Sequence, residues 1–181
     1  MLATAFKSTL MVALAFILVG TSSPSLAVKR LLTEARVDLI NKEKESVGTA
    51  FLRETPTGIQ IHLTLQKVPE GVHGLHLHEV GKCDTPDFKS AGGHVNPMAL
   101  THGIMNSKGF HLGDLPNIHV GSEGKLEVEV FVPESSLDKF NKNLLDEDGA
   151  ALVVHEGADD YTTDPAGAAG PRIACGIIEK K

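Results

Sequence analysis

Alternation of apolar and polar residues is the feature of this sequence that most restricts how the chain can fold. It begins near Val37 and Leu39, is clearest in 59–66, and returns in 126–132, while short apolar runs at 151–154 and 173–178 are also strand-like. A period of two residues predicts β-strands with one buried face. No long pattern with a period of 3.6 residues competes with it. The 18 glycines and 9 prolines, with no tryptophan, also fit a turn-rich β protein better than a helical bundle.

Two long segments between these strands are too rich in turn residues and polar groups to form strands. Residues 81–124 are rich in glycine, proline, asparagine and histidine, and residues 156–171 in aspartate, glycine and alanine. Loops of this length are usually functional. The sequence therefore predicts one antiparallel domain, a β-sandwich or flattened Greek-key barrel, with two long functional loops.

The first residues resemble an export signal. Lys7 gives a positive start, an apolar run extends from Leu10 to Gly20, and Ser25-Leu26-Ala27 offers small residues for cleavage. We expect residues 1–27 to be removed and residues 28–181 to form the exported domain, with no membrane contact. The apolar run is shorter than the roughly 20 residues of a membrane span, so an uncleaved anchor is the weaker alternative.

The charge of the chain limits its partners. The formal net charge is −6, and loss of Lys7 with the signal would make it −7. Nucleic acids and anionic membranes attract clustered lysine and arginine. An acidic exported domain therefore argues against nucleic acid as a partner.

Only two cysteines, Cys83 and Cys175, are present. In an oxidising compartment an even count favours a disulfide, and only one pairing exists. Two unpaired buried thiols are the alternative.

Most of the nine histidines lie between positions 71 and 111. His76 and His78 are two residues apart, so on a strand their side chains leave the same face and can bind one metal ion. His73 is three residues before His76 and would point to the other face. This removes His73 from the ligands and favours a positioning role through a hydrogen bond to the backbone. An exposed face merely decorated with histidine is the alternative.

A second polar set lies in the first long loop. It contains three histidines and a carboxylate: His94, His102, His111 and Asp114. Such a set is typical of a closed tetrahedral zinc site, although loop histidines can also be simply solvated. His155, which follows the apolar run 151–154, is a further candidate ligand.

Six motifs, taken in order, resemble the copper/zinc superoxide dismutase family over nearly all of residues 28–181. They are GxHGxHxH at 71–78, GGHxNP at 92–97, HG at 102–103, HxGDL at 111–115, VVHEGADD at 153–160 and GPRIACG at 170–176. The runs at 87–94 and 113–117 resemble the bacterial periplasmic branch. The resemblance implies an all-β, Greek-key, flattened eight-stranded barrel that acts on superoxide in the periplasm.

The same resemblance implies one copper and one zinc ion per chain. The implied copper ligands are His76, His78, His94 and His155, and the implied zinc ligands are His94, His102, His111 and Asp114. His94 would bind both metals as an imidazolate. Asp159 would bridge the non-coordinating nitrogens of His76 and His102 and so tie the two sites together.

In the implied reaction, one superoxide reduces copper and leaves as oxygen, and a second reoxidises copper and leaves as hydrogen peroxide. His94 would supply a proton to the product. Arg172 would attract the anionic substrate to a protein whose net charge is negative. A disulfide at Cys175, three residues later, would anchor the strand that carries Arg172. Lys82 and Lys89 could assist this steering.

Some features depart from the resemblance or match nothing in it. Ala166 occupies a position where relatives commonly carry a small hydroxyl residue, and the loop 165–171 is poor in polar side chains. His62 and His119 match no ligand position, and alternation predicts that His62 faces solvent.

The sequence does not distinguish a homodimer from a monomer. Two rival functions would use the same residues. A copper-buffering or metal-binding module needs the ligands but not Arg172. A zinc hydrolase with Glu156 as base needs an open zinc position, which a site with four protein ligands lacks.

Overall fold

The computed structural model describes residues 33–138 and 144–181, and the predicted signal peptide lies outside them. Its elements are the strands β1 (Glu34–Asn41), β2 (Ser46–Thr55), β3 (Gly58–Leu65), β4 (Gly71–His73), β5 (Leu75–His78), β6 (Ile118–Val120), β7 (Leu126–Pro133), β8 (Ala151–His155) and β9 (Arg172–Lys180), and a short 3-10 helix, η1 (Lys89–Ala91). Within these ranges no helix is long and apolar enough to cross a membrane.

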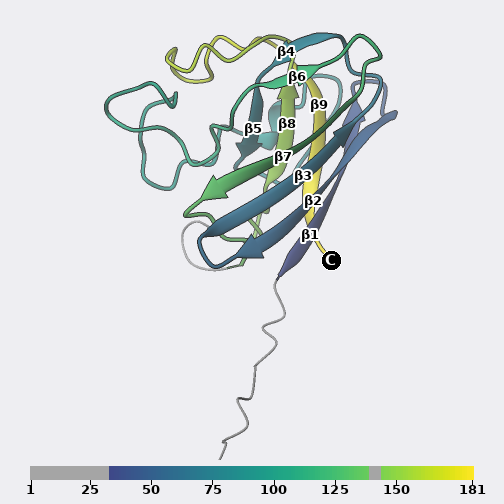
Figure 1. Cartoon of the computed structure of the whole chain (residues 1–181). Helices are drawn as coiled ribbons and strands as arrows, with labels where there is room; N and C mark the ends of the chain where they lie inside the picture. The colour runs from purple at the N-terminus through teal and green to yellow at the C-terminus, as the bar shows by residue number, and fades with distance from the viewer. Residues whose placement is uncertain (1–32, 139–143) are drawn as a thin grey trace, which may run out of the picture. The chain divides into compact units, whose positions relative to one another are not determined.

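Seven strands form one antiparallel sheet in the order β5-β8-β9-β1-β2-β3-β7, and β4 pairs with β6 in a second, two-stranded sheet. The larger sheet curls (Figure 1). Because β9 pairs with β1 and β8 with β5, the chain repeatedly crosses between strands that are distant in sequence, as Greek-key proteins do. The predicted all-β class is confirmed. The segment 71–78 is broken at Gly74 into β4 and β5, so His73 and His76 belong to different sheets.

The core follows the predicted alternation. In β3, Ile59, Ile61, Leu63 and Leu65 are at most 1% exposed, whereas His62 and Thr64 face outward. In β7 the valines at 130 and 132 are buried between exposed neighbours. Strand β2 was not predicted, although Ala50 and Leu52 join the same core.

The two predicted long loops, 81–124 and 156–171, lie against each other. Loop 81–124 contains η1 and the unpredicted strand β6, and loop 156–171 contains no strand. The loops contact each other, because the backbone N–H of His102 donates to Asp164 and that of Met105 to the Tyr161 carbonyl. The two loops therefore pack together as one unit next to β5 and β8.

The predicted disulfide is present between Cys83 and Cys175, which are 92 residues apart in sequence. It fastens the start of the first loop to β9. Phe88, fully buried, packs with Val153 and Cys175 in a small apolar cluster separate from the main core. Together the disulfide and Phe88 fix the segment that contains η1 against β8 and β9.

Candidate metal centre

Strand β5 brings the first two histidines together, as their spacing predicted. His76 and His78 alternate with Leu75 and Leu77, and all four residues are buried. The leucines join the main core, while the long loops cover the histidines. Strand β5 therefore has no exposed face, although its apolar and polar residues alternate.

A first cluster forms where β5, β8 and the first loop meet. It consists of His76, His78, His94 and His155, whose nearest ring nitrogens all lie within 4.8 Å of one another. Main-chain pairing brings these residues together: His78 forms an isolated bridge with His94, and β5 pairs with β8 along its length.

Each ring of the first cluster has one buried nitrogen without a hydrogen-bond partner among the described residues. These atoms are His76 Nδ1, His78 Nε2, His94 Nε2 and His155 Nε2. The opposite nitrogen of His78 donates to the Gly92 carbonyl and that of His155 to the Gly170 carbonyl, both at 3.0 Å. A buried polar atom left unpaired costs about 1–3 kcal/mol. Four such nitrogens converging on one point fit a metal ion, and imidazoles suit copper.

A second cluster forms around Asp114. Its Oδ1 lies 2.7 Å from His94 Nδ1, 3.0 Å from His102 Nδ1 and 3.2 Å from His111 Nδ1. Its Oδ2 accepts the backbone N–H groups of Gly103 and His111. Three nitrogens and an oxygen, all buried, form the donor set that zinc prefers.

His94 belongs to both clusters through opposite edges of one ring. Its Nδ1 faces Asp114, and its Nε2 is one of the unpartnered nitrogens of the first cluster. The side chain is 3% exposed and thus almost completely buried. It can therefore contact an ion on each side.

Asp159 links the clusters from the second loop. Its Oδ2 lies 2.8 Å from His76 Nε2 and its Oδ1 lies 3.0 Å from His102 Nε2. Asn117 holds the backbone of Asp159 at two points: its side-chain amide donates to the Asp159 carbonyl and accepts the Asp159 N–H, both at 2.8 Å. Asn117 lies in the sequence run 113–117, but no role could be assigned to it from the sequence.

Burial determines the charge states of the metal-free clusters. Loss of solvation lowers the pKa of His78 to about 2, of His155 to about 3 and of His94 to about 4, helped for His78 and His155 by the charge of Arg172. Burial alone would raise the pKa of Asp114, but hydrogen bonds from His94 and Gly103 outweigh it and lower the pKa to about 2. Neutral imidazoles and an ionised carboxylate are the forms that bind metals.

Arg172 lies at the start of β9, paired with His155 across β8. It donates one hydrogen bond to the Phe88 carbonyl and another to the Gly92 carbonyl, both at 2.6 Å. Arg172 also lines a surface pocket of about 850 Å³ together with Lys89 and Glu156. Lys89 itself pairs with Asp87 at 3.0 Å, so part of its charge is neutralised locally.

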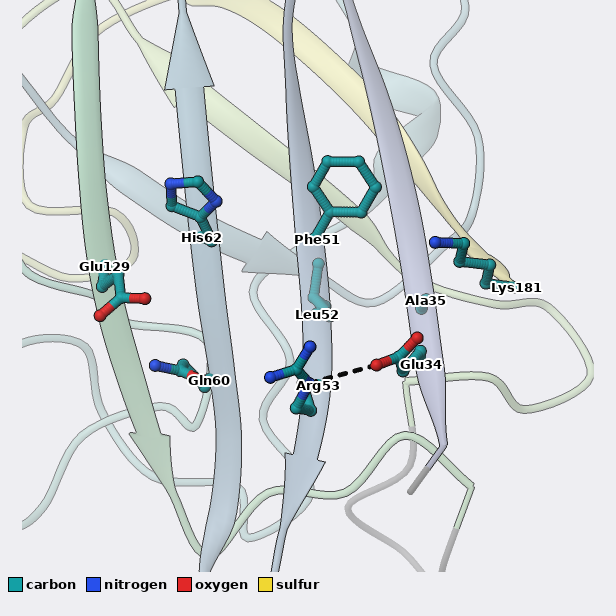
Figure 2. Close-up of a pocket in the computed structure, with 9 residues that line it drawn as sticks. All are labelled: Glu34, Ala35, Phe51, Leu52, Arg53, Gln60, His62, Glu129 and Lys181. Carbon is teal, nitrogen blue, oxygen red and sulfur yellow. Dashed lines mark hydrogen bonds and ion pairs between the residues drawn. The ribbon is translucent and has the colours of Figure 1, made fainter. Parts of the chain in front are cut away.

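The remaining histidines lie outside both clusters. His73 is buried, with its ring nitrogens 2.8 Å from the His155 carbonyl and 2.9 Å from the Pro69 carbonyl. His119 is exposed. His62 faces solvent, as alternation predicted, and contacts Glu127 at 3.0 Å. Figure 2 shows the surface pocket that His62 lines on the outer face of β1, β2, β3 and β7, and no residue of either cluster lines this pocket.

Comparison with known proteins finds one family. The family model described as copper/zinc superoxide dismutase (SODC) matches residues 46–178. "Superoxide dismutase (Cu-Zn) 1" of Aquifex aeolicus (strain VF5) is 47% identical over 148 residues, 81% of this chain and 88% of that protein. "Superoxide dismutase-like protein YojM" of Bacillus subtilis (strain 168) is 46% identical over 145 residues, 78% of this chain and 74% of that protein.

Solved structures agree with the sequence relatives. A SOD-like protein from Bacillus subtilis superposes with a TM-score of 0.76 at 44% identity, covering 78% of this chain and 96% of that one. The Cu/Zn superoxide dismutase from Brucella abortus gives a TM-score of 0.65 at 30% identity, covering 81% of this chain and 99% of that one.

Proposed function

Because the chain belongs to the copper/zinc superoxide dismutase family, we propose that its two polar clusters are the sites of its copper and zinc cofactors. The protein is an oxidoreductase that converts superoxide into oxygen and hydrogen peroxide.

Copper is assigned to the cluster of His76, His78, His94 and His155. The observation that supports this most strongly is the set of four buried, unpartnered ring nitrogens that converge there. When bound, copper supplies one-electron chemistry, accepting an electron from one superoxide and returning one to the next. His76, His78 and His155 would hold the ion through both oxidation states, because the opposite nitrogen of each ring has a fixed partner in the protein.

Zinc is assigned to the cluster of His94, His102, His111 and Asp114. All four positions would be filled by protein atoms, which is the pattern of structural rather than catalytic zinc sites. This argues against a zinc hydrolase with Glu156 as base. The site would also order a loop that has little apolar content of its own.

His94 is assigned two functions that follow from its place between the clusters. As a ligand of both ions it would use both ring nitrogens, so neither nitrogen could then carry a proton. When His94 Nε2 takes up a proton, that proton lies inside the site and can pass to the peroxide product. The same atom thus serves as ligand and as acid.

Arg172 is assigned to the attraction and orientation of superoxide. Its guanidinium is fixed by two backbone carbonyls beside His78 and His155, in a protein whose net charge opposes an anion. A metal-buffering module would have no need of this group. Ala166, which stands where relatives commonly carry a hydroxyl residue, leaves the loop before Arg172 with one hydrogen-bonding group fewer.

We assign the protein to the periplasm, with residues 1–27 removed on export. The Cys83–Cys175 disulfide supports this, because disulfides persist in oxidising compartments. The mature domain would act without membrane or nucleic acid, as a monomer or homodimer. Mass spectrometry of the protein recovered from a periplasmic extract should give a chain beginning at Val28, and an intact N-terminus would contradict the assignment.

The shared ring is the best test of the metal assignment. His94→Ala should lower the superoxide dismutation rate by about a hundredfold or more and alter the electron paramagnetic resonance spectrum of Cu(II). His62→Ala, which removes an exposed histidine, is the matched control and should behave as the parent. Diffraction at the copper and zinc absorption edges should locate two ions on either side of the ring. An unchanged rate and spectrum in His94→Ala, or two ions with no ring between them, would refute the assignment.

A further inference from the structure

One peptide group, between Gly92 and Gly93, contacts three side chains around the first cluster. Its carbonyl oxygen accepts the Nδ1–H of His78 at 3.0 Å and an N–H of Arg172 at 2.6 Å. Its N–H group donates to Glu79 Oε1 at 3.0 Å. The group therefore joins a proposed copper ligand, the proposed substrate-guiding arginine and an acidic residue with no role so far.

The local backbone is shaped to admit the Glu79 side chain. Gly92 has φ +75°, in the left-handed region, and a Cβ there would lie 2.9 Å from Glu79 Cγ and 3.0 Å from Glu79 Oε1. A side chain at this position would displace the carboxylate. The backbone N–H of Glu79 also donates to the Gly93 carbonyl at 3.0 Å. Glu79 is thus bonded to both main-chain groups of Gly93.

We propose that Glu79 is a positioning residue that orients the Gly92–Gly93 peptide, and through it both His78 and Arg172. This inference rests on the proposed roles of His78 and Arg172. With the N–H held by a carboxylate, the carbonyl of the same rigid peptide points toward the ring and the guanidinium. One side chain, in the residue that follows β5, thereby sets the ring orientation of His78 and the position of the Arg172 charge.

Three features make this contact effective. A hydrogen bond to an ionised carboxylate is stronger than one between neutral groups, and a peptide that donates to an anion becomes a better acceptor at its carbonyl. Glycine at both positions leaves the peptide free to rotate when nothing holds it. Because the Glu79–Gly93 contact is exposed to solvent, we expect an effect of several-fold rather than an all-or-none loss.

Positioning and simple electrostatics predict opposite results when Glu79 is replaced. Removing a negative charge near an anion-binding site should, by charge alone, tighten anion binding. If Glu79 holds the peptide, its removal should weaken anion binding because Arg172 loses its fixed place. Glu79→Gln removes the charge but keeps an oxygen acceptor, so it separates the two effects.

The test uses the copper- and zinc-loaded protein with azide, a small anion, as the probe. The azide dissociation constant is measured from the Cu(II) absorption and paramagnetic resonance spectra for the parent, Glu79→Ala, Glu79→Gln, Arg172→Ala and the control Glu129→Ala, which removes an exposed glutamate on β7. Hydrogen exchange of the Gly93 amide in the metal-free protein reports the contact itself. Thermal unfolding confirms that each variant folds.

We expect Glu79→Ala to raise the azide dissociation constant about threefold to tenfold, change the Cu(II) spectrum and speed exchange at Gly93. Glu79→Gln should bind azide nearly as the parent does, and Glu129→Ala should be unchanged. Azide binding in Glu79→Ala that equals or exceeds the parent's would overturn the inference, even if Gly93 exchange is faster. Unchanged azide binding in Arg172→Ala would instead overturn the proposed role of Arg172, and this inference with it.

Discussion

Removal of the disulfide should weaken the fold far more than it weakens metal binding. The Cys83–Cys175 bridge closes a loop with a sequence separation of 92 residues. In the chain-entropy model, opening a loop of this length stabilises the unfolded chain by about 4 to 5 kcal/mol. Neither cysteine belongs to a metal cluster. Cys83→Ser should therefore lower the free energy of unfolding by about that amount and leave the metal content close to that of the parent.

Urea unfolding of the metal-free protein, followed by circular dichroism, measures this effect without a contribution from bound ions. A loss of this size should lower the urea midpoint by roughly 2 to 4 M. The double variant Cys83→Ser/Cys175→Ser is the matched control, because it also lacks the bridge but leaves no free thiol. The two variants should unfold alike. A fall of less than about 1 kcal/mol in Cys83→Ser would refute the reasoning, since loop closure alone exceeds that value.

The other predictions concern charge and backbone at the clusters. In the metal-free protein, burial lowers the pKa of His78 to about 2 and of His155 to about 3, from 6.5. The folded state therefore binds fewer protons than the unfolded chain does. The free energy of unfolding should fall as the pH drops from about 6.5 toward 4, by about 1.4 kcal/mol per pH unit per ring. A urea midpoint that stays constant over this range would contradict the prediction. Arg172→Ala should retain both metals by elemental analysis but lose about tenfold or more in rate and much of the salt dependence, whereas full activity would argue against steering. Gly167 has φ +62°, and Gly167→Ala should place a methyl group against the Asp159 carboxylate and the His102 ring. This should weaken zinc binding roughly tenfold to a hundredfold, measured by competition with a chelator. Unchanged zinc affinity would argue against the role of Asp159 in joining the two clusters.

The sequence predicted the strands that show either a clear alternation or a short apolar run, and it missed β2 and β6. In β2, Phe51 stands on the outer face, where Arg36 and Lys181 each approach its ring at 5.4 Å, while Glu54 is buried. These two exceptions obscure the alternation. Strand β6 has three residues and exists only through its pairing with β4, so no local pattern could indicate it.

The residues of the two clusters could be predicted because histidine and aspartate side chains carry the chemistry themselves. Their partners were not, because several are backbone carbonyls. The carbonyls of Gly92, Gly170 and Leu100 accept from, or face, the rings of His78, His155 and His111. A carbonyl occurs in every residue, so only its direction in the folded chain makes it useful.

These partners determine which nitrogen of each ring is free. His78 donates through Nδ1 to Gly92, His155 through Nδ1 to Gly170, and His76 faces Asp159 through Nε2. A neutral imidazole that donates through one nitrogen keeps a lone pair on the other, and in all three rings that other nitrogen points into the first cluster. The tautomers that the proposed copper site requires are therefore set by hydrogen bonds that do not involve a metal ion. It follows that binding of an ion by these three residues would need no ring flip.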